Sequence, residues 1–478
     1  TTHMENGMAS TSGWSALLLG KNGLRSAALA GGVALHAINV YLVTTLLPSV
    51  VKDIGGLDYY AWNTTLFVVA SIIGSVLSTR ALALLGPKAA YGLAGLVFML
   101  GCSLCALAAD MGGLILGRSV QGLGGGLLFA LPYAMIRLVF DEPLWPRAMA
   151  LISAMWGAAT LIGPAVGGIF AEHGAWRAAF WVLLPCTLLF MLLAVALLPG
   201  KSRESAPRSP IPALQLLLLT AVVLAISIGS ITPSPLYNAL GLGAGLVLLV
   251  PVFALENRDG ARLLPRNSLK AGSALLALYI SMALLVVGMT SEVFVPLFLQ
   301  VLHQQTPLLA GYIAALMAAG WTLGAIFSSG LGPRGAARAI AIGPFLVVAG
   351  LLLACLFMPA TATPALSLGA VCLAMLLVGV GIGLAWPHLL SRVLEQAPQD
   401  QKELAGASIT TVQLVATALG AALAGMIVNL AGLTSTGGTA GAAQAAAWLF
   451  GLYAGLSALL FVSVRQVRRN GSPHLAQA

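Results

Sequence analysis

Charged residues are scarce in this chain. Only 8% of its 478 residues are Asp, Glu, Lys or Arg, while 59% are hydrophobic, and the mean hydropathy is +0.97. Soluble globular domains carry about 25% charged residues, so this composition excludes that class. It is typical of an α-helical protein whose chain crosses a membrane many times.

Reactive and metal-binding side chains are also sparse. The five cysteines all lie in apolar runs, and although Cys102 and Cys105 have CxxC spacing, no histidine or second pair accompanies them. We expect them to be packing residues rather than metal or redox ligands. Residues 122–126 (GLGGG) resemble a phosphate-binding loop but lack its lysine and its preceding strand. The sequence therefore predicts no catalytic residue, no metal, no cofactor and no enzymatic activity.

Long hydrophobic runs, in contrast, fill the chain. A helix needs about 20 apolar residues to cross a bilayer. Fourteen runs approach or exceed this length, at 26–49, 60–82, 89–109, 111–136, 148–171, 177–198, 211–229, 238–255, 272–300, 307–329, 336–358, 366–391, 404–431 and 443–465. The predicted fold class is an all-α polytopic membrane protein with two six-helix bundles and two linker helices.

The polar breaks between these runs suggest five parts. We expect a cytoplasmic tail at 1–25, whose opening TTHMENGMAS includes an expression-tag remnant, and a second cytoplasmic tail at 466–478. Between them lie an N-terminal bundle at 26–198, a linker with two extra membrane helices at 199–270, and a C-terminal bundle at 271–465.

The placement of the basic residues indicates the topology. With both termini in the cytoplasm, Lys52 and Arg177 lie outside and Arg118 lies within a span, and the other 20 of the 23 Lys and Arg face the cytoplasm. This is a strong positive-inside bias. It also explains the net charge of +9, because basic loops face anionic lipid headgroups. We therefore expect membrane lipid, not nucleic acid, as the partner of this charge.

The two sets of six runs resemble each other. Pro48, which we expect to end the first span, matches Pro296 in the ninth. Further landmarks recur in order after nearly constant intervals: LGPK at 85–88 and LGPR at 331–334, Gly122–Gly124–Gly126 and Gly379–Gly381–Gly383, and Gly163–Gly168 and Gly420–Gly425. Two parallel halves are a known transporter plan, with the substrate site near the membrane midplane.

With these features the chain resembles the major facilitator superfamily, and within it the 14-span drug:proton antiporters. The fourth span, LILGRSVQGLGGGLL, resembles the family's R-x-x-Q-G motif with Arg118, Gln121 and Gly122. The fifth, ATLIGPAVGG, resembles the antiporter motif, carried here by Ala159, Gly163, Pro164, Gly167 and Gly168 and followed by Trp176, Arg177 and Phe180. The resemblance implies alternating access, powered by a proton gradient and not by a cofactor.

Two positions depart from the family pattern. Asn39 stands where this branch usually has an aspartate in the first span. The loop after the second span, TRALALLGPK, keeps only Gly86 and Lys88 of the usual charged motif. By resemblance we assign these two residues, with Gly332 and Arg334 in the second half, to cytoplasmic gate loops.

Three ionisable residues are candidates for proton coupling. Ionisable groups deep in a membrane are costly and usually functional. Glu292 is the one acid well inside a span: either a protonatable site beside the cavity, or a hydrated structural residue near the outer end. Arg118 has a coupling role by resemblance or a structural one, with Asn39, His36 or free carbonyls as partners. His36 either titrates in place of the missing aspartate or remains neutral and hydrogen bonded.

We expect a substrate cavity lined by aromatic and amide side chains. Such side chains suit lipophilic ligands and, through their π faces, cations. The candidates are Asn39, Tyr41, Gln121, Tyr133, Trp156, Tyr279, Phe294, Trp321, Trp386 and Gln413. Taken singly, each could instead face lipid or pack between helices.

The expected function is secondary transport: proton-coupled export of small lipophilic or cationic compounds by a monomer in a bacterial inner membrane. Two alternatives stay open at this point. One is an exporter, uniporter or symporter of a specific metabolite or siderophore, which the loss of the aspartate at position 39 favours. The other is a non-transporting membrane receptor on the same fold.

Overall fold

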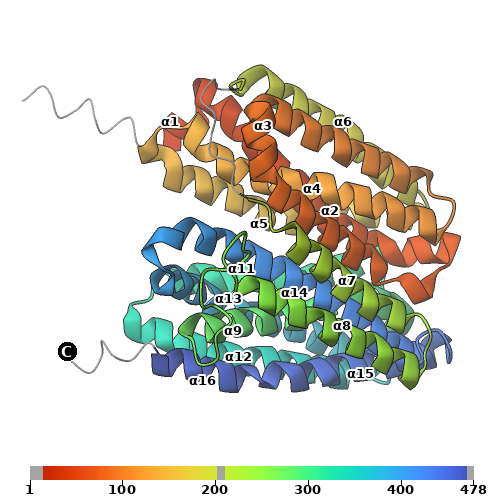
Figure 1. Ribbon diagram of the computed structural model, residues 1–478. Coiled ribbons are helices and arrows are strands. Elements are labelled where there is room, and N and C mark those ends of the chain that lie inside the picture. Colours follow the sequence, from red (N-terminus) through yellow and green to blue (C-terminus); the bar gives the residue numbers. More distant parts are fainter. Residues whose placement is uncertain (1–13, 202–209, 471–478) are drawn as a thin grey trace, which may run out of the picture. The chain divides into compact units, whose positions relative to one another are not determined.

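The computed structural model describes residues 14–201 and 210–470, and every regular element in these ranges is a helix (Figure 1). The first part of the chain contains α1 (Trp14–Leu18), α2 (Gly20–Ile54), η1 (Leu57–Tyr59), α3 (Trp62–Leu107), α4 (Met111–Val139), η2 (Glu142–Leu144), α5 (Trp145–Glu172) and α6 (Trp176–Leu197). The linker pair is α7 (Ala213–Ser230) and α8 (Pro235–Glu256). The remaining elements are α9 (Ala274–Met289), η3 (Thr290–Phe294), α10 (Val295–Leu302), α11 (Pro307–Ser329), α12 (Pro333–Phe357), α13 (Pro364–Gln396), η4 (Gln399–Gln401), α14 (Lys402–Leu430), α15 (Gly438–Ala458) and α16 (Leu460–Asn470).

The membrane-spanning helices confirm the predicted fold class. Thirteen helical segments of the described chain are long and apolar enough to cross a bilayer. One of them, Leu57–Leu107, holds the second and third hydrophobic runs, separated by a kink at Gly86, where φ is 80° and ψ is 169°. Only glycine adopts such a backbone without strain. The fourteen runs are therefore all helical, and two of them join at this glycine.

One expected boundary is wrong. Pro48 does not end the first span, because α2 continues to Ile54. A proline inside a helix removes one backbone hydrogen bond, but Pro48 is buried, and a packed membrane helix tolerates this loss.

The chain forms two compact units. The first holds the described residues up to 54 and 69–211, and in it α2 packs against α4, α5 and α6. The second holds Gly55–Val68 and the described residues from 212 onward. In the second unit α13 packs against α11 and α12, while α9 packs against α14 and α16.

The linker pair packs within the second unit. α7 contacts α8 along its length and also contacts α14. Glycines permit the close approach of α7 and α8: a Cβ at Gly241 would lie 2.8 Å from the carbonyl oxygen of Ala225. Small residues at such contacts are typical of membrane helices.

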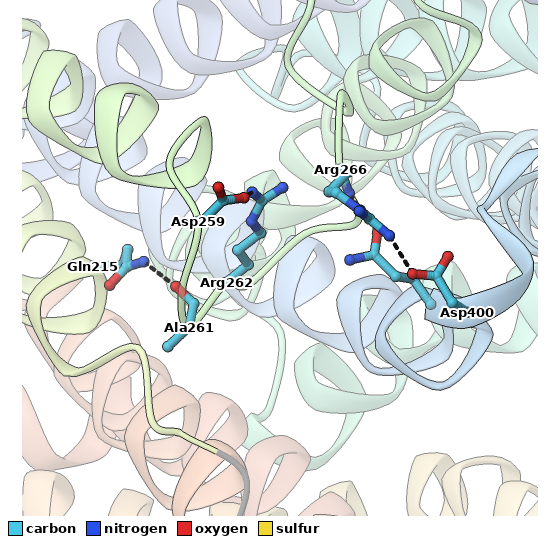
Figure 2. A network of polar contacts seen from close by, with 7 residues as sticks. Gln215, Asp259, Ala261, Arg262, Arg266 and Asp400 are labelled. Atoms are coloured by element: carbon cyan, nitrogen blue, oxygen red, sulfur yellow. Dashed lines mark hydrogen bonds and ion pairs between the residues drawn. The ribbon is translucent and has the colours of Figure 1, made fainter.

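The loop after α8 is fixed to its surroundings by polar contacts (Figure 2). The Gln215 amide on α7 donates to the carbonyl of Ala261 at 2.7 Å. Arg266 forms an ion pair with Asp400 in η4, and its backbone N–H donates to Gln401 Oε1 at 2.7 Å. The loop thus joins the linker pair to the beginning of α14.

Candidate functional site

Glu292 lies at a break in the helical path. α9 ends at Met289, the 3-10 helix η3 carries Glu292, and α10 begins at Val295 with Pro296 in its first turn. Proline suits that position because its missing N–H would have no helical partner there. The Glu292 Oε2 atom is buried and makes no hydrogen bond to any described residue. A carboxylate in apolar surroundings is costly unless it is paired, so this position suits a group that takes up and releases a proton.

Arg118 and Gln121 form a buried polar pair on α4. Arg118 Nη1 donates to Gln121 Oε1 at 2.5 Å, and Gln121 Nε2 donates to the Cys102 sulfur at 3.1 Å. Arg118 is 2% exposed and Gln121 is fully buried. A buried guanidinium requires acceptors, and Gln121 supplies one. Asn39 is not a partner of Arg118, because its amide oxygen accepts no hydrogen bond from the described residues.

The close approach of α3 and α4 produces this arrangement. A Cβ at Gly117 would lie 2.7 Å from the backbone nitrogen of Cys105 and 2.8 Å from its sulfur. Cys102 and Cys105 are both buried at this contact. The sequence predicts packing for them, and the structure adds that Cys102 also accepts a hydrogen bond from Gln121.

An aromatic cluster joins three helices of the first unit. The ring of His36 on α2 stacks on Phe129 of α4, with centroids 5.3 Å apart, and meets the edge of Trp156 of α5 at 5.8 Å. Tyr133 lies one turn after Phe129, with ring centroids 5.9 Å apart, and contacts Ser153 on α5. Three predicted residues therefore meet around Phe129, which the prediction omitted. Its position four residues before Tyr133, on the same helix face, is the signal that could have identified it.

Asn39 lies one turn after His36 on α2. It is fully buried, and neither atom of its side-chain amide makes a hydrogen bond to a described residue. Leaving such groups without partners costs about 1–3 kcal/mol each. Functional sites are where natural proteins retain this kind of cost. Asn39 is therefore a buried polar residue of the first unit whose amide group has no partner among the described residues.

The antiporter-like motif is a close helix contact. A Cβ at Gly163 would lie 2.5 Å from the Tyr41 Cβ and 3.0 Å from the carbonyl oxygen of Ile38. A Cβ at Gly167 would lie 2.6 Å from the carbonyl oxygen of Leu42. α5 therefore lies directly against α2. The other motif positions, Ala159, Pro164 and Gly168, are part of the same helix α5. Tyr41, predicted to line the cavity, is buried at this contact.

The residues of the second unit that we expected to line the cavity lie in separate places. Tyr279 on α9 and Ser408 on α14 share a hydrogen bond of 2.6 Å. Trp321 on α11 meets Trp386 on α13 at 5.0 Å and 65°. Phe294 stacks on a residue the prediction omitted, Tyr60, and Gln413 lies half-buried on α14.

The predicted gate loops also differ from each other. Gly86 is the kink in α3, and Lys88 donates its backbone N–H to Pro199 at 3.3 Å. Gly332 caps the N-terminus of α12, and Arg334 lies in that helix's first turn. The two repeated sequences thus form a bend within a helix in the first half and a helix start in the second.

An ion pair at the start of α6 was also missed. The Asp53 carboxylate at the end of α2 accepts hydrogen bonds from Trp176 Nε1 at 2.9 Å and Arg177 Nη1 at 2.8 Å. Arg177 also donates to the carbonyl of Ala108 and lies over the ring of Trp176. The resemblance pointed to Trp176 and Arg177, but nothing in the sequence indicated Asp53 as their partner.

The Major Facilitator Superfamily profile matches residues 29–421 of this sequence. The chain belongs to the major facilitator superfamily. A Mycobacterium tuberculosis protein named "Probable multidrug-efflux transporter" is 40% identical over 448 residues, which cover 92% of each chain. A multidrug transporter protein of Bacillus subtilis is 25% identical and covers 82% of this chain and 73% of its own.

Solved structures share the fold of this superfamily member. A POT-family peptide transporter in complex with sulfate matches with a TM-score of 0.69 at 16% identity, covering 94% of this chain and 95% of its own. A human organic anion transporter matches with a TM-score of 0.59 at 17% identity, covering 92% and 99%. At these identities the likeness shows the fold alone. The chain is an integral membrane transporter of this superfamily.

Proposed function

We propose that this transporter exports small lipophilic or cationic compounds in exchange for protons, by alternating access. The observation that carries the proton coupling is Glu292, a half-buried residue at a helix break whose Oε2 atom is buried and has no partner among the described residues. A group in this position can hold a proton when substrate is absent and release it when access changes. The multidrug-efflux names of the relatives support the export of varied compounds.

The aromatic cluster supports this substrate class. The rings of His36, Phe129, Trp156 and Tyr133 offer π faces and edges to a lipophilic ligand. Cations over such rings gain about 0.5–2 kcal/mol. Asn39 would add a neutral polar contact. Arg118 and His36 are the remaining candidates for a part in proton coupling.

Proton coupling can be tested in proteoliposomes with an imposed pH gradient. A lipophilic cation such as tetraphenylphosphonium serves as substrate. Glu292→Gln should abolish gradient-driven accumulation but keep exchange of substrate for substrate, because the amide mimics the protonated acid and cannot release a proton. Glu395→Gln, at an exposed acid near the end of α13, is the matched control and should behave as the parent. Gradient-driven accumulation by Glu292→Gln would refute the assignment.

A second candidate is facilitated transport, or symport, of one specific metabolite. The neutral Asn39 in the first span favours it, since a carboxylate there would suit cations. Facilitated transport requires downhill flux of a single compound that no pH gradient alters, whereas proton symport requires a single compound that moves in the same direction as the protons. A panel of labelled metabolites in the same proteoliposomes would distinguish the two functions.

The cellular setting is part of this proposal. We place the protein as a monomer in a bacterial inner membrane, with both termini in the cytoplasm and the basic loops against anionic lipid. Its partners would be the substrate, protons and lipid, with no nucleic acid and no cofactor. The excess of Lys and Arg in the predicted cytoplasmic segments and the bacterial origin of the named relatives support this.

A further inference from the structure

One face of the second unit combines arginine side chains with an exposed apolar surface. It is formed by α12 and α16, which contact each other, and α16 also packs on α9 (Figure 1). These three helices contain no Asp or Glu. Their five arginines are Arg334 and Arg338 on α12 and Arg465, Arg468 and Arg469 on α16. A basic surface without acids of its own attracts anions.

Two contacts fix the relative direction of these helices. The rings of Phe345 on α12 and Phe461 on α16 lie 4.6 Å apart. Further along α12, the Cys355 thiol donates to the carbonyl of Ala447 on α15, the helix that precedes α16. Because residue numbers rise along α12 as they fall along its neighbour, the helices are antiparallel. The first turns of α12 and the last turns of α16 therefore lie at the same end.

Helix geometry places arginines of both helices close to one level. Residues four or seven apart share a helix face, and each residue advances the axis by about 1.5 Å. Arg338 precedes Phe345 by seven residues, a distance of about 10 Å along the axis. Arg465 follows Phe461 by four residues and Arg468 follows it by seven. Arg338 is therefore level with the turn of α16 that carries Arg465 and Arg468.

The described chain does not neutralise two of these arginines. Arg338 and Arg465 are exposed, and neither forms an ion pair with a described residue. Residues 471–478, which follow α16, contain no Asp or Glu. α12 also begins at this end, after the N-cap Gly332, and the first N–H groups of a helix favour an anion. The charges at this end therefore suit an anionic ligand.

The apolar part of the face continues from the arginines along the membrane spans. Phe345 is 63% exposed, Ile342 is 48% exposed and Val462 is 70% exposed. They lie in Pro333–Phe357 and Gly438–Arg469, both long and apolar enough to cross a bilayer. The second of these spans has 32 residues and is about 48 Å long, whereas the hydrocarbon core is about 30 Å thick. Its arginine-bearing end can therefore reach the lipid headgroups.

The combination of charge and apolar surface favours one class of ligand. A soluble phosphate would use the arginines alone. A phospholipid uses both parts, because one molecule joins an anionic headgroup to acyl chains, and basic sites between membrane helices bind such headgroups. Arginine suits this role, since its planar guanidinium group donates two parallel hydrogen bonds to a phosphate.

We propose that the face formed by α12 and α16 binds one anionic phospholipid, whose phosphate bridges Arg338 and Arg465 and whose acyl chains lie along Phe345 and Val462. The proposal rests on the proposed topology, in which this end of both helices meets the cytoplasmic leaflet and its anionic lipids. The bound lipid joins two helices of the folded chain. A ligand that binds only the folded state raises the melting temperature.

The test compares two lipids on the purified, delipidated chain in an uncharged maltoside detergent. Dioleoylphosphatidylglycerol is the anionic probe and dioleoylphosphatidylcholine the zwitterionic one. Native mass spectrometry counts the retained lipids, and thermal unfolding measures the stabilisation. The parent should retain one phosphatidylglycerol in preference to phosphatidylcholine and melt at a higher temperature with it. Arg338→Gln combined with Arg465→Gln should weaken this retention several-fold, and lysine at both positions should restore most of it.

A second pair of substitutions controls for the loss of charge. Arg80→Gln combined with Arg258→Gln removes the same charge from exposed positions that we also expect at the cytoplasmic side, and it should retain the lipid as the parent does. Equal losses in the two glutamine pairs would overturn the proposal. So would equal retention of both lipids by the parent, or the same stabilisation by glycerol phosphate alone. If the Arg338 and Arg465 pair does not fold, the two single variants decide.

Lipid binding is measured without transport, so the two proposals can fail separately. Retention that depends on Arg338 and Arg465 in a protein that exports no compound would keep the lipid site and reject the exporter. Proton-driven export by a chain whose variants all retain phosphatidylglycerol equally would keep the exporter and reject the lipid site.

Discussion

The contact between α2 and α5 gives the sharpest test of the packing. Gly163→Ala adds one methyl group, and its carbon would lie 2.5 Å from the Tyr41 Cβ, 3.0 Å from the Ile38 carbonyl oxygen and 3.2 Å from the Leu42 nitrogen. All three are backbone atoms or a Cβ, so no flexible side chain can move aside. Ordinary carbon contacts lie at about 3.5–4.0 Å, so the two helices must separate locally by about 1 Å.

The expected loss of stability follows from this displacement. Overpacking of a close-packed contact costs about 1–3 kcal/mol. Gly157→Ala on the same helix is the matched control, because nothing lies within 4 Å of its added Cβ. That change should be neutral or stabilise the helix by up to about 1 kcal/mol, since alanine is the better helix former.

The measurement is thermal unfolding of both variants in the same detergent, followed by intrinsic fluorescence and by size-exclusion recovery. Gly163→Ala should unfold at a lower temperature than the parent, and Gly157→Ala at the same or a higher one. Gly163→Leu should be more severe and should also impair transport. Equal melting of the two alanine variants would mean that α5 does not lie this close to α2.

Three further changes test other parts of the structure. Asn39→Asp should raise transport of cationic over neutral compounds, because it places a carboxylate where an unpartnered amide now lies; an unchanged ratio in competition assays would count against Asn39 as a ligand contact. Glu256→Gln should destabilise the protein by about 1.5–3 kcal/mol, because the buried carboxylate accepts hydrogen bonds from two backbone N–H groups, one of them that of Leu263 at 2.9 Å. An unchanged melting temperature would argue against these two hydrogen bonds. Gly86→Ala should be destabilising by at least about 1 kcal/mol, since its φ is 80° and the Cα of Lys201 lies 2.6 Å from the added Cβ; the same melting temperature as the parent would show that α3 is not kinked there.

Much of the fold could be predicted because each membrane-spanning helix is a long run of apolar residues that can be recognised in the sequence. Each of the fourteen hydrophobic runs is helical, since a chain in lipid must satisfy its backbone hydrogen bonds internally. The ends of the helices are harder to predict from composition. Pro48 suggested that the first helix ends there, but α2 continues past it. Gly86 joins two hydrophobic runs that composition alone would assign to separate helices.

The candidate site was only partly predictable, because contacts between helices are not local in sequence. Glu292 was identifiable as a rare acid in an apolar run, and the structure places it at a helix break. The Cys102–Gln121 hydrogen bond and the seat of Tyr60 on Phe294 join distant segments. Periodicity identifies the face of one helix but not the partner that covers it.

The repeated glycine pairs, Gly163–Gly168 and Gly420–Gly425, show how far the sequence repeat predicts contacts between helices. Gly163, the first glycine of the pair in the first half, meets α2, the first long helix of that half. Gly420 correspondingly meets Thr290 of η3, which directly continues α9, the first helix of the second half. The repeat therefore predicts the partner of Gly420.

Gly425 has a different kind of neighbour, Ala61 of the segment Gly55–Val68 between the first two spans. Because Ala61 follows Tyr60 directly, this glycine gives the segment room to seat its aromatic ring on Phe294. A larger residue at position 425 would keep the helix but hold the segment away from α14. Gly425 therefore serves a close contact between α14 and the segment Gly55–Val68.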